Sequence, residues 1–271
     1  MKKISIITPC YNAEDYIAET INSVLNQTGR LSNRFELEYI VCDGGSSDKT
    51  VDIIKQYSKQ DIILISEPDN GMYDALAKGL RLVTGDICAY INADDYYSPY
   101  AFDIVLEIFE KFNVNWVTGL TVSYCSKGYL TNIALPQPYK KELIQCGYYG
   151  TKLPFIQQES TFWRSKLNHR IDLNKLAELR YAGDYYLWKQ FSETENLAIV
   201  MAYLGGFRSR QGQLSQNKKS YYDEMKLIAD KPSIKDKISL LNIKLSKYYP
   251  FRFKRLLSKY ILYDYNIDTW I

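Results

Sequence analysis

The chain has 271 residues, of which 46% are hydrophobic and 24% are charged, the balance of a soluble globular protein with a sizeable core. Residues 1–150 carry 13 Lys and Arg against 19 Asp and Glu, whereas the remainder carries 21 Lys and Arg against 12 Asp and Glu. An acidic half suited to binding a cation therefore precedes a basic half suited to binding phosphate or an anionic surface. No apolar segment has the length of a membrane span, and no signal peptide or nucleic-acid motif is recognisable, so we expect a cytoplasmic protein that does not bind nucleic acid.

Strand and helix signals alternate along the first hundred residues. Continuous apolar runs predict buried strands over residues 4–9, 37–42, 62–66 and 87–91. Helical patterns predict helices that begin after an Asn12 N-cap, at residue 50, at residue 72, and at Pro99 after a Ser98 N-cap. This order predicts an α/β fold with a doubly wound, mostly parallel (Rossmann-like) sheet and helices on both faces.

The second half of the chain has weaker signals. We predict a strand over residues 116–124, a loop-rich stretch to residue 154, a helix over 181–191 and a strand near 197–203. From residue 231 to residue 260 the sequence is helical and basic, with nine Lys and Arg against one acid, Asp236. This tail predicts an amphipathic helix that lies on anionic lipid, and a helix packed on the rest of the protein is the alternative.

Polar residues follow each of the four predicted strands, at the edge where open α/β sheets bind ligands. The residues concerned are Thr8, Pro9, Tyr11 and Asn12 at the end of the first strand, Asp43-Gly44 at the end of the second, Asp69 after the third, and Asn92-Ala93-Asp94-Asp95 after the fourth. Magnesium and manganese bind one or two carboxylates together with substrate phosphates, which fits the pair Asp94 and Asp95. Acid pairs also cap helices and occupy turns, so this pair alone leaves both interpretations open.

A further acid, Asp184, lies in the opening turn of the predicted helix over 181–191. It either stabilises the helix dipole or serves as a carboxylate base. The segment 207–215 contains Arg208 and Arg210, and it is either a lid that brings an arginine to a diphosphate or a mobile surface loop.

The order of these motifs resembles the family 2 glycosyltransferases of GT-A fold, over about residues 3–215. The segments DGGSSDKT, SEPDNGMYDALAKG, NADDYYSP and AGDYYLW are similar to those of bacterial members that assemble O antigen, capsule or exopolysaccharide. The resemblance implies an inverting enzyme that moves a sugar from a nucleotide-sugar donor, with UDP-sugars favoured, to a glycan or lipid-linked glycan. It implies a catalytic domain over residues 1–215, with a nucleotide-sugar-binding half (1–112) and an acceptor-side half (113–215). From its own composition we expect residues 216–271 to form a basic helical extension, which contact with lipid would place at the inner face of the cell membrane.

The resemblance also implies roles for individual residues. The nucleotide sugar would lie against Thr8, Pro9, Tyr11, Asn12, Asp43, Gly44, Asp69, Lys78 and Asp94. Asp94 and Asp95 match the family's motif for Mn²⁺ or Mg²⁺, with Asp95 as the direct ligand, and Asp184 matches the catalytic base. The acceptor or the diphosphate would meet Gln158, Glu159, Trp163, Arg208 and Arg210, and a place in the core is the alternative for Trp163.

The chain departs from the family pattern at three positions. Gly44 stands where many members have a second acid, Leu76 where many have an arginine, and Gly183 where an acid often precedes the base. Lys78 is the candidate replacement for the arginine.

Two other functions stay open at this point. A sugar-nucleotide nucleotidyltransferase would ordinarily have a Gly-rich basic loop after the first strand, where this chain has Pro9-Cys10-Tyr11-Asn12. A non-catalytic protein that binds nucleotide sugars or glycans would have no need to retain both Asp95 and Asp184.

Overall fold

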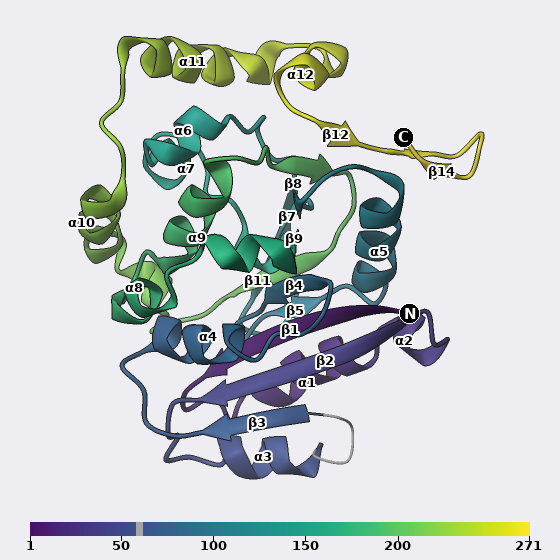
Figure 1. The fold of residues 1–271 in the computed structure, drawn as a ribbon, viewed down its shortest axis with the longest axis vertical. Helices are drawn as coiled ribbons and strands as arrows, with labels where there is room; N and C mark the ends of the chain where they lie inside the picture. The colour runs from purple at the N-terminus through teal and green to yellow at the C-terminus, as the bar shows by residue number, and fades with distance from the viewer. Residues whose placement is uncertain (58–61) are drawn as a thin grey trace.

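The computed structural model describes residues 1–57 and 62–271. Its main sheet has eight strands in the order β12-β10-β6-β9-β4-β1-β2-β3 (Figure 1). Strands β1 to β4 run parallel to one another, and β9 runs antiparallel to its neighbours β4 and β6. The strands are β1 (Lys2–Cys10), β2 (Phe35–Asp43), β3 (Ile62–Ser66), β4 (Ile87–Tyr90), β6 (Trp116–Thr118), β9 (Thr161–Arg164), β10 (Ala198–Val200) and β12 (Tyr260–Ile261). The predicted mostly parallel α/β sheet is confirmed.

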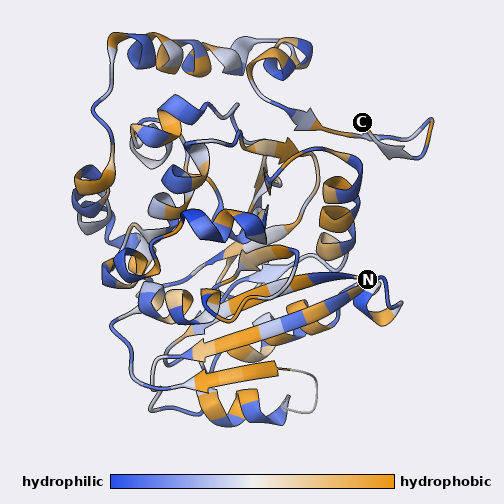
Figure 2. Ribbon diagram, in the orientation of Figure 1, coloured by the Kyte–Doolittle hydropathy of each residue, from blue (hydrophilic) through white to orange (hydrophobic). Residues whose placement is uncertain are grey.

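Helices pack on this sheet through apolar faces, and hydrophobic residues dominate strands such as β3 (Figure 2). Helix α4 packs against β1 and β2 and also against α8, whereas α1 packs against α3. The helices of this part are α1 (Ile17–Leu25), α2 (Thr28–Leu31), α3 (Thr50–Gln56), α4 (Met72–Leu80), α5 (Ala101–Lys111), α6 (Lys141–Gln145), α7 (Tyr148–Thr151), α8 (Leu173–Glu178) and α9 (Gly183–Ser192).

Two predicted helix starts are wrong. Helix α1 begins at Ile17, because the side chain of Asn12 accepts a hydrogen bond from the Ser47 N–H (2.9 Å) and its backbone is left-handed, with φ of 46°. Helix α5 begins at Ala101, after a turn in which the Pro99 carbonyl accepts the Thr28 N–H (3.0 Å). At Asn12 a contact with a distant segment replaces the local cap, whereas the Ser98 hydroxyl still accepts a hydrogen bond from the Tyr100 N–H (3.4 Å).

A second sheet of four strands, β5-β11-β7-β8, crosses the carboxyl edge of the first. Its strands are β5 (Tyr96–Tyr97), β7 (Thr121–Cys125), β8 (Leu130–Ala134) and β11 (Gly205–Ser209). The single strand predicted over 116–124 is therefore two strands in different sheets. The pairing of Gly206 with Tyr96 draws the segment after residue 205 toward the turn that contains Asp94 and Asp95.

The C-terminal residues form α10 (Lys218–Ile228), α11 (Ile234–Leu245), α12 (Phe251–Leu257), β12 and a hairpin of β13 (Tyr263–Asp264) and β14 (Thr269–Trp270). Short 3-10 helices occur at 158–160, 165–170, 214–216 and 246–248. The tail is helical as expected to residue 257, and β12 then joins the edge of the main sheet beside β10, which the sequence did not predict. Within the two described ranges, no helix combines the length and the apolar character of a membrane span.

The close approach of β11 to residue 159 requires a glycine. A Cβ at Gly205 would lie 2.8 Å from the carbonyl carbon of Glu159. We expect Gly205→Ala to lower the free energy of unfolding by about 2 kcal/mol, because backbone must move to make room. Chemical denaturation measures this. Ser209→Ala, at an exposed position of the same strand, should have little effect, and equal effects of the two variants would contradict this account.

Candidate active site

The acid pair lies in the turn that follows β4. Asp95 is fully buried, and its carboxylate accepts hydrogen bonds from the Arg208 backbone N–H (2.7 Å) and from the Asn92 amide (3.2 Å). Burial, reinforced by the charges of Glu159 and Asp94, raises the pKa of Asp95 well above its ordinary value. The turn therefore holds a concentration of carboxylates that favours a bound cation or proton.

Two arginines approach these acids from β11 and the loop after it. The Arg210 guanidinium donates to the Asp94 carboxylate (2.6 Å), which also accepts a hydrogen bond from Gln213 (2.9 Å). Arg208 is buried, forms an ion pair with Glu19 of α1, and lies over the Tyr96 ring at 4.7 Å. The structure thus brings Arg208 and Arg210 to the acid pair, with Arg210 the more exposed of the two.

The oxygen atoms of this turn fit a divalent cation. The side-chain oxygen of Asn92 is buried without a hydrogen-bond partner, beside the carboxylate of Asp95. Magnesium and manganese prefer such carboxylate and carbonyl oxygens and fill their other positions with phosphate oxygens and water. Within residues 1–57 and 62–271, no set of three or more His, Cys, Asp and Glu side chains is arranged to hold a metal by itself. A site of this kind would be completed by the diphosphate of a substrate.

The ends of β1 and β2 meet as the sequence predicted. Asp43 is buried and accepts hydrogen bonds from the Gly45 N–H (3.2 Å) and the Ser66 hydroxyl (2.7 Å). The Asn12 N–H donates to the hydroxyl of Ser46 (2.8 Å), which in turn donates to Asp43. These hydrogen bonds hold the loops after β1 and β2 against each other. Asp43 therefore has a structural role at this edge of the sheet, in addition to lying beside it.

The other residues predicted to contact the nucleotide differ in their exposure to solvent. Tyr11 is 63% exposed beside this edge, and Pro9 is buried. The structure corrects the expectation for the side chain of Thr8, which is fully buried and hydrogen-bonded to the Tyr39 hydroxyl (3.0 Å). Lys78 forms an ion pair with Glu67 (2.9 Å) and donates to a backbone carbonyl of the same loop (3.1 Å). Thr8 lies in a stretch of β1 that is buried on both faces of the central sheet, which explains its position.

The departures at Gly44 and Gly183 have a steric explanation. A Cβ at Gly44 would lie 2.8 Å from the carboxyl carbon of Asp69, and a Cβ at Gly183 would lie 2.7 Å from the Tyr73 ring. Asp69, held by the Gly71 N–H (2.7 Å), therefore places a carboxylate where a side chain at position 44 would extend. Burial raises the pKa of Asp69. Asp69, which follows β3, therefore supplies the carboxylate that position 44 lacks.

Asp184 belongs to a second cluster, in the first turn of α9. Its carboxylate accepts hydrogen bonds from the Tyr185 N–H (2.7 Å), the Tyr221 hydroxyl (3.0 Å) and the Tyr73 hydroxyl (3.5 Å). Burial raises the pKa of Asp184 to about 6, although these three donors act in the opposite direction. A carboxylate with this pKa is ionised near neutral pH and is basic enough to accept a proton.

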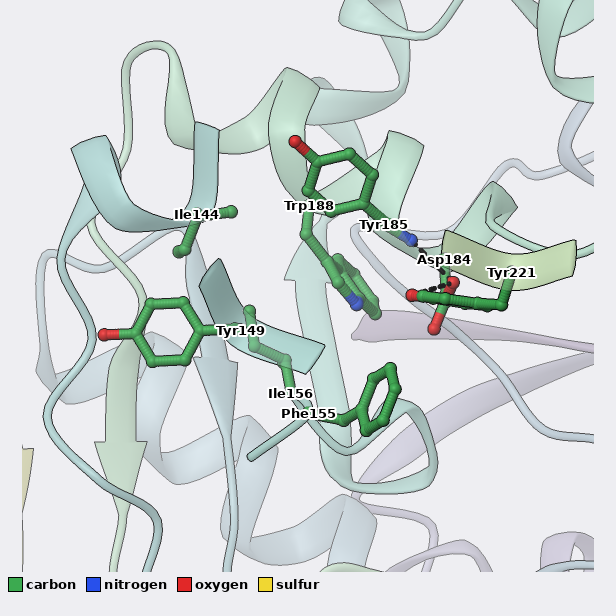
Figure 3. Close-up of a pocket in the computed structure, with 8 residues that line it drawn as sticks. All are labelled: Ile144, Tyr149, Phe155, Ile156, Asp184, Tyr185, Trp188 and Tyr221. Atoms are coloured by element: carbon green, nitrogen blue, oxygen red, sulfur yellow. Dashed lines mark hydrogen bonds between the residues drawn. The ribbon is translucent and has the colours of Figure 1, made fainter. Parts of the chain in front are cut away.

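The Asp184 carboxylate lies at the edge of a small pocket, where it faces the Tyr221 hydroxyl (Figure 3). Most of the other lining side chains are aromatic or aliphatic: Ile144, Tyr149, Phe155, Ile156, Tyr185 and Trp188. With a volume of about 10 Å³, the pocket has room for about one water molecule, so a sugar that met Asp184 would have to lie outside it.

Helix α10 holds the start of α9 in place. The carboxylate of Glu224 accepts hydrogen bonds from the backbone N–H groups of residues 180, 181 and 182, at 2.9, 2.7 and 2.6 Å. The same helix supplies Tyr221. The sequence did not indicate the contacts of Tyr73, Tyr221 and Glu224 with this cluster, because the three residues come from elements distant from α9 in the chain. Tyr73 lies in the segment SEPDNGMYDALAKG, which by itself does not show that contact.

The acceptor-side residues lie deeper than the sequence suggested. Gln158 is buried against the Tyr90 carbonyl, and Glu159 is buried beside Asp95, where burial raises its pKa. Trp163 corrects the expectation of a sugar contact: it is fully buried, and its ring packs on Phe191 at 5.4 Å. The alternative of a core position therefore holds for Trp163.

Residues 5–171 match the family model described as Glycosyl transferase family 2. The chain belongs to this family. It is therefore a glycosyltransferase, as the order of motifs predicted. Asp184, Arg208 and Arg210 lie beyond the matched residues, and their roles stay predictions.

Named relatives agree with this membership. The chain is 27% identical over 221 residues to the Escherichia coli UDP-Glc:alpha-D-GlcNAc-diphosphoundecaprenol beta-1,3-glucosyltransferase WfgD, covering 79% of this chain and 80% of that protein. It is 34% identical over 223 residues to the uncharacterized glycosyltransferase EpsJ of Bacillus subtilis, and the match covers 79% of this chain and 63% of that protein. The chain spans less than two thirds of the length of most curated relatives that it matches.

The fold also has solved counterparts. A crystal structure of residues 1–349 of S. aureus TarS in complex with UDP-GlcNAc has a TM-score of 0.65 and 19% sequence identity, covering 94% of this chain and 74% of that chain. The fold is thus the GT-A fold of glycosyltransferases, as predicted.

The three hydrogen bonds to Glu224 predict a clear stability effect. We expect Glu224→Ala to lower the free energy of unfolding by about 2 kcal/mol, because three N–H groups lose a charged acceptor that solvent only partly replaces. Thermal and chemical unfolding would measure it. Asp223→Ala, which removes an exposed acid from the same helix, is the matched control and should change stability little. If the two variants were equally stable, the role of Glu224 in holding residues 180–182 would be wrong.

Proposed function

We propose that the protein transfers a sugar from a nucleotide-sugar donor to a hydroxyl group of a glycan acceptor, with inversion at the anomeric carbon, in bacterial polysaccharide synthesis. The observation that carries this proposal is the Asp184 carboxylate, with a pKa of about 6, at the edge of an aromatic pocket. Asp184 accepts the proton of the acceptor hydroxyl, whose oxygen attacks the anomeric carbon as the bond to the diphosphate breaks. One displacement of this kind inverts the configuration.

The donor side of the proposal rests on the acid pair and the arginine beside it. Asp94 and Asp95 would hold a Mn²⁺ or Mg²⁺ ion, which would neutralise the charge that develops on the departing diphosphate. Arg210 is the arginine better suited to reach the diphosphate, because it is partly exposed and contacts Asp94 directly, whereas Arg208 is buried between aromatic rings and Glu19. Asp43, Asp69 and Asn12 would border the nucleoside.

The nature of donor and acceptor follows from the relatives by analogy. WfgD is named for a UDP-glucose donor and a diphosphoundecaprenol-linked acceptor, and the TarS structure contains UDP-GlcNAc. We therefore favour a UDP-sugar as donor and a lipid-linked glycan as acceptor. A lipid-linked acceptor would require the enzyme to work at a membrane surface, and the basic C-terminal segment is the part suited to that contact.

A thermal-shift panel with UDP-, GDP- and dTDP-sugars, each with and without Mn²⁺, tests the donor side. A ligand at a hundred times its dissociation constant stabilises the native state by about 2.7 kcal/mol. We expect the largest shift with a UDP-sugar and Mn²⁺, and its loss in Asp94→Ala/Asp95→Ala. Asp52→Ala, an exposed acid on α3, is the control. The absence of a shift with every nucleotide sugar would contradict the proposal.

The base is tested separately by Asp184→Asn. We expect this variant to bind the donor normally and to lose transfer activity by a factor of about a hundred to ten thousand, the range for a lost general base. Activity is measured as release of nucleoside diphosphate in the presence of acceptor. Full activity of Asp184→Asn would show that another group accepts the proton.

Activity should also depend on pH in a defined direction. Asp184 accepts a proton only when it is ionised, so transfer should decline as pH falls through about 6. Tyr221→Phe removes a donor that stabilises the ionised form, so the pKa of Asp184 should rise by about one unit and the decline should begin at higher pH. Tyr222→Phe, the neighbouring tyrosine of α10, is the matched control. A shift of the profile in both variants, or in neither, would contradict the role given to the Tyr221 hydroxyl.

A further inference from the structure

Helix α11 has two apolar faces. One packs on the protein, with Ile243 fully buried and the Ser239 hydroxyl donating to Glu142 of α6 (3.0 Å). The other faces solvent and consists of Ile234, Ile238, Leu241 and Leu245, which we call the outer stripe; these side chains are 77%, 64%, 58% and 44% exposed. They are four, three and four residues apart, so they form one continuous row along the helix.

This row is unusual for a helix that already contacts a core. A surface helix normally turns polar residues to solvent, and large exposed apolar patches mark interaction sites. Beyond α11, Tyr248 (74% exposed) and, on α12, Leu256 (78% exposed) are further exposed apolar side chains. In Figure 1 the two helices lie end to end along one side of the molecule, and Figure 2 shows hydrophobic and hydrophilic residues alternating along them.

The charges around the outer stripe are all positive. Lys235 lies on one side of it and Lys237 and Lys244 on the other, all exposed, and α12 adds exposed Arg252 and Arg255. The one acid between residues 231 and 260, Asp236, turns inward and caps the helix by accepting the Ser233 N–H (2.7 Å). An apolar row between cations complements a surface that is apolar inside and anionic at its rim.

We propose that α11 and α12 form a docking surface for an anionic lipid bilayer, with the outer stripe inserted among the acyl chains and the lysines at the phosphate groups. A second copy of the chain is a poor occupant, because the same surface on both copies would bring lysine against lysine. Long lysine side chains extend along the apolar surface and keep their charges at the headgroups, as this arrangement requires.

The surface lies one helix away from the pocket of Asp184. Glu142 of α6 holds α11, and Ile144 of the same helix lines the pocket. For a lipid-linked acceptor, which is part of the proposed function, docking would bring the acceptor's headgroup region close to the base. Binding to lipid itself does not depend on that function.

Flotation of the full chain with lipid vesicles tests the proposal. We expect the protein to float with vesicles of phosphatidylcholine mixed with phosphatidylglycerol, to stay in solution with phosphatidylcholine alone, and to be released by salt. Ile238→Glu/Leu241→Glu should weaken vesicle binding at least about tenfold, because two charges would enter the apolar layer. Lys235→Gln/Lys237→Gln/Lys244→Gln should weaken it about a hundredfold, given the attraction of each lysine for an anionic surface.

The control is Leu130→Glu/Ile133→Glu, which makes the same change at two exposed apolar residues of β8. It should bind vesicles like the unchanged protein, and thermal unfolding checks that all variants are folded. The proposal would be overturned by equal binding to neutral and anionic vesicles or by no binding to either. It would also be overturned if Leu130→Glu/Ile133→Glu lost as much vesicle binding as Ile238→Glu/Leu241→Glu. A dimer in solution that Ile238→Glu/Leu241→Glu converts to a monomer would likewise overturn it. Donor hydrolysis in solution should be unchanged in Ile238→Glu/Leu241→Glu, which separates this proposal from the proposed function.

Discussion

The buried carboxylate of Asp95 is the group around which the active-site edge is arranged. A carboxylate removed from water is costly unless nearby donors stabilise it, and the donors here come from different parts of the chain. The Asn92 amide comes from its own turn and the Arg208 N–H from β11. The Asp95 carbonyl in turn accepts the hydroxyl of Thr20 in α1 (2.7 Å). One residue thereby joins the central sheet, the second sheet and a helix, and the arginine loop comes to the acids as a result.

Helix α10 stabilises the cluster around Asp184 in a similar way. A helix start leaves N–H groups without partners, and Glu224 provides the acceptor for those that precede α9. Tyr221, one turn earlier on α10, reaches Asp184. Asp184 is consequently held by a segment that lies beyond the residues matched by the family model, and α4, α9 and α10 together build the environment that sets its pKa.

At two positions, a side chain from another element occupies the space beside a glycine. Asp69 fills the volume beside Gly44, and the ring of Tyr73 fills the volume beside Gly183. Both side chains come from the loop and helix that follow β3, so this one segment shapes the sheet edge beside Gly44 through Asp69 and the surroundings of Asp184 through Tyr73. Leu76, in the same helix, is fully buried and faces the core, so no side chain at that position is directed to a ligand.

The sequence by itself determined the four parallel strands β1 to β4, the order of the motifs and the family, because apolar runs, helix periodicity and acids at strand ends are local patterns. It also indicated Asp94, Asp95 and Asp184 as candidate site residues. Only the tertiary structure decided the contacts between distant segments: the burial of Thr8 and Trp163, the later starts of α1 and α5, the joining of β12 to the sheet, and the donors from Tyr73, Tyr221 and Glu224. Sequence periodicity reports which face of an element is buried, whereas the partner that buries it is set by the free energy of packing the whole chain.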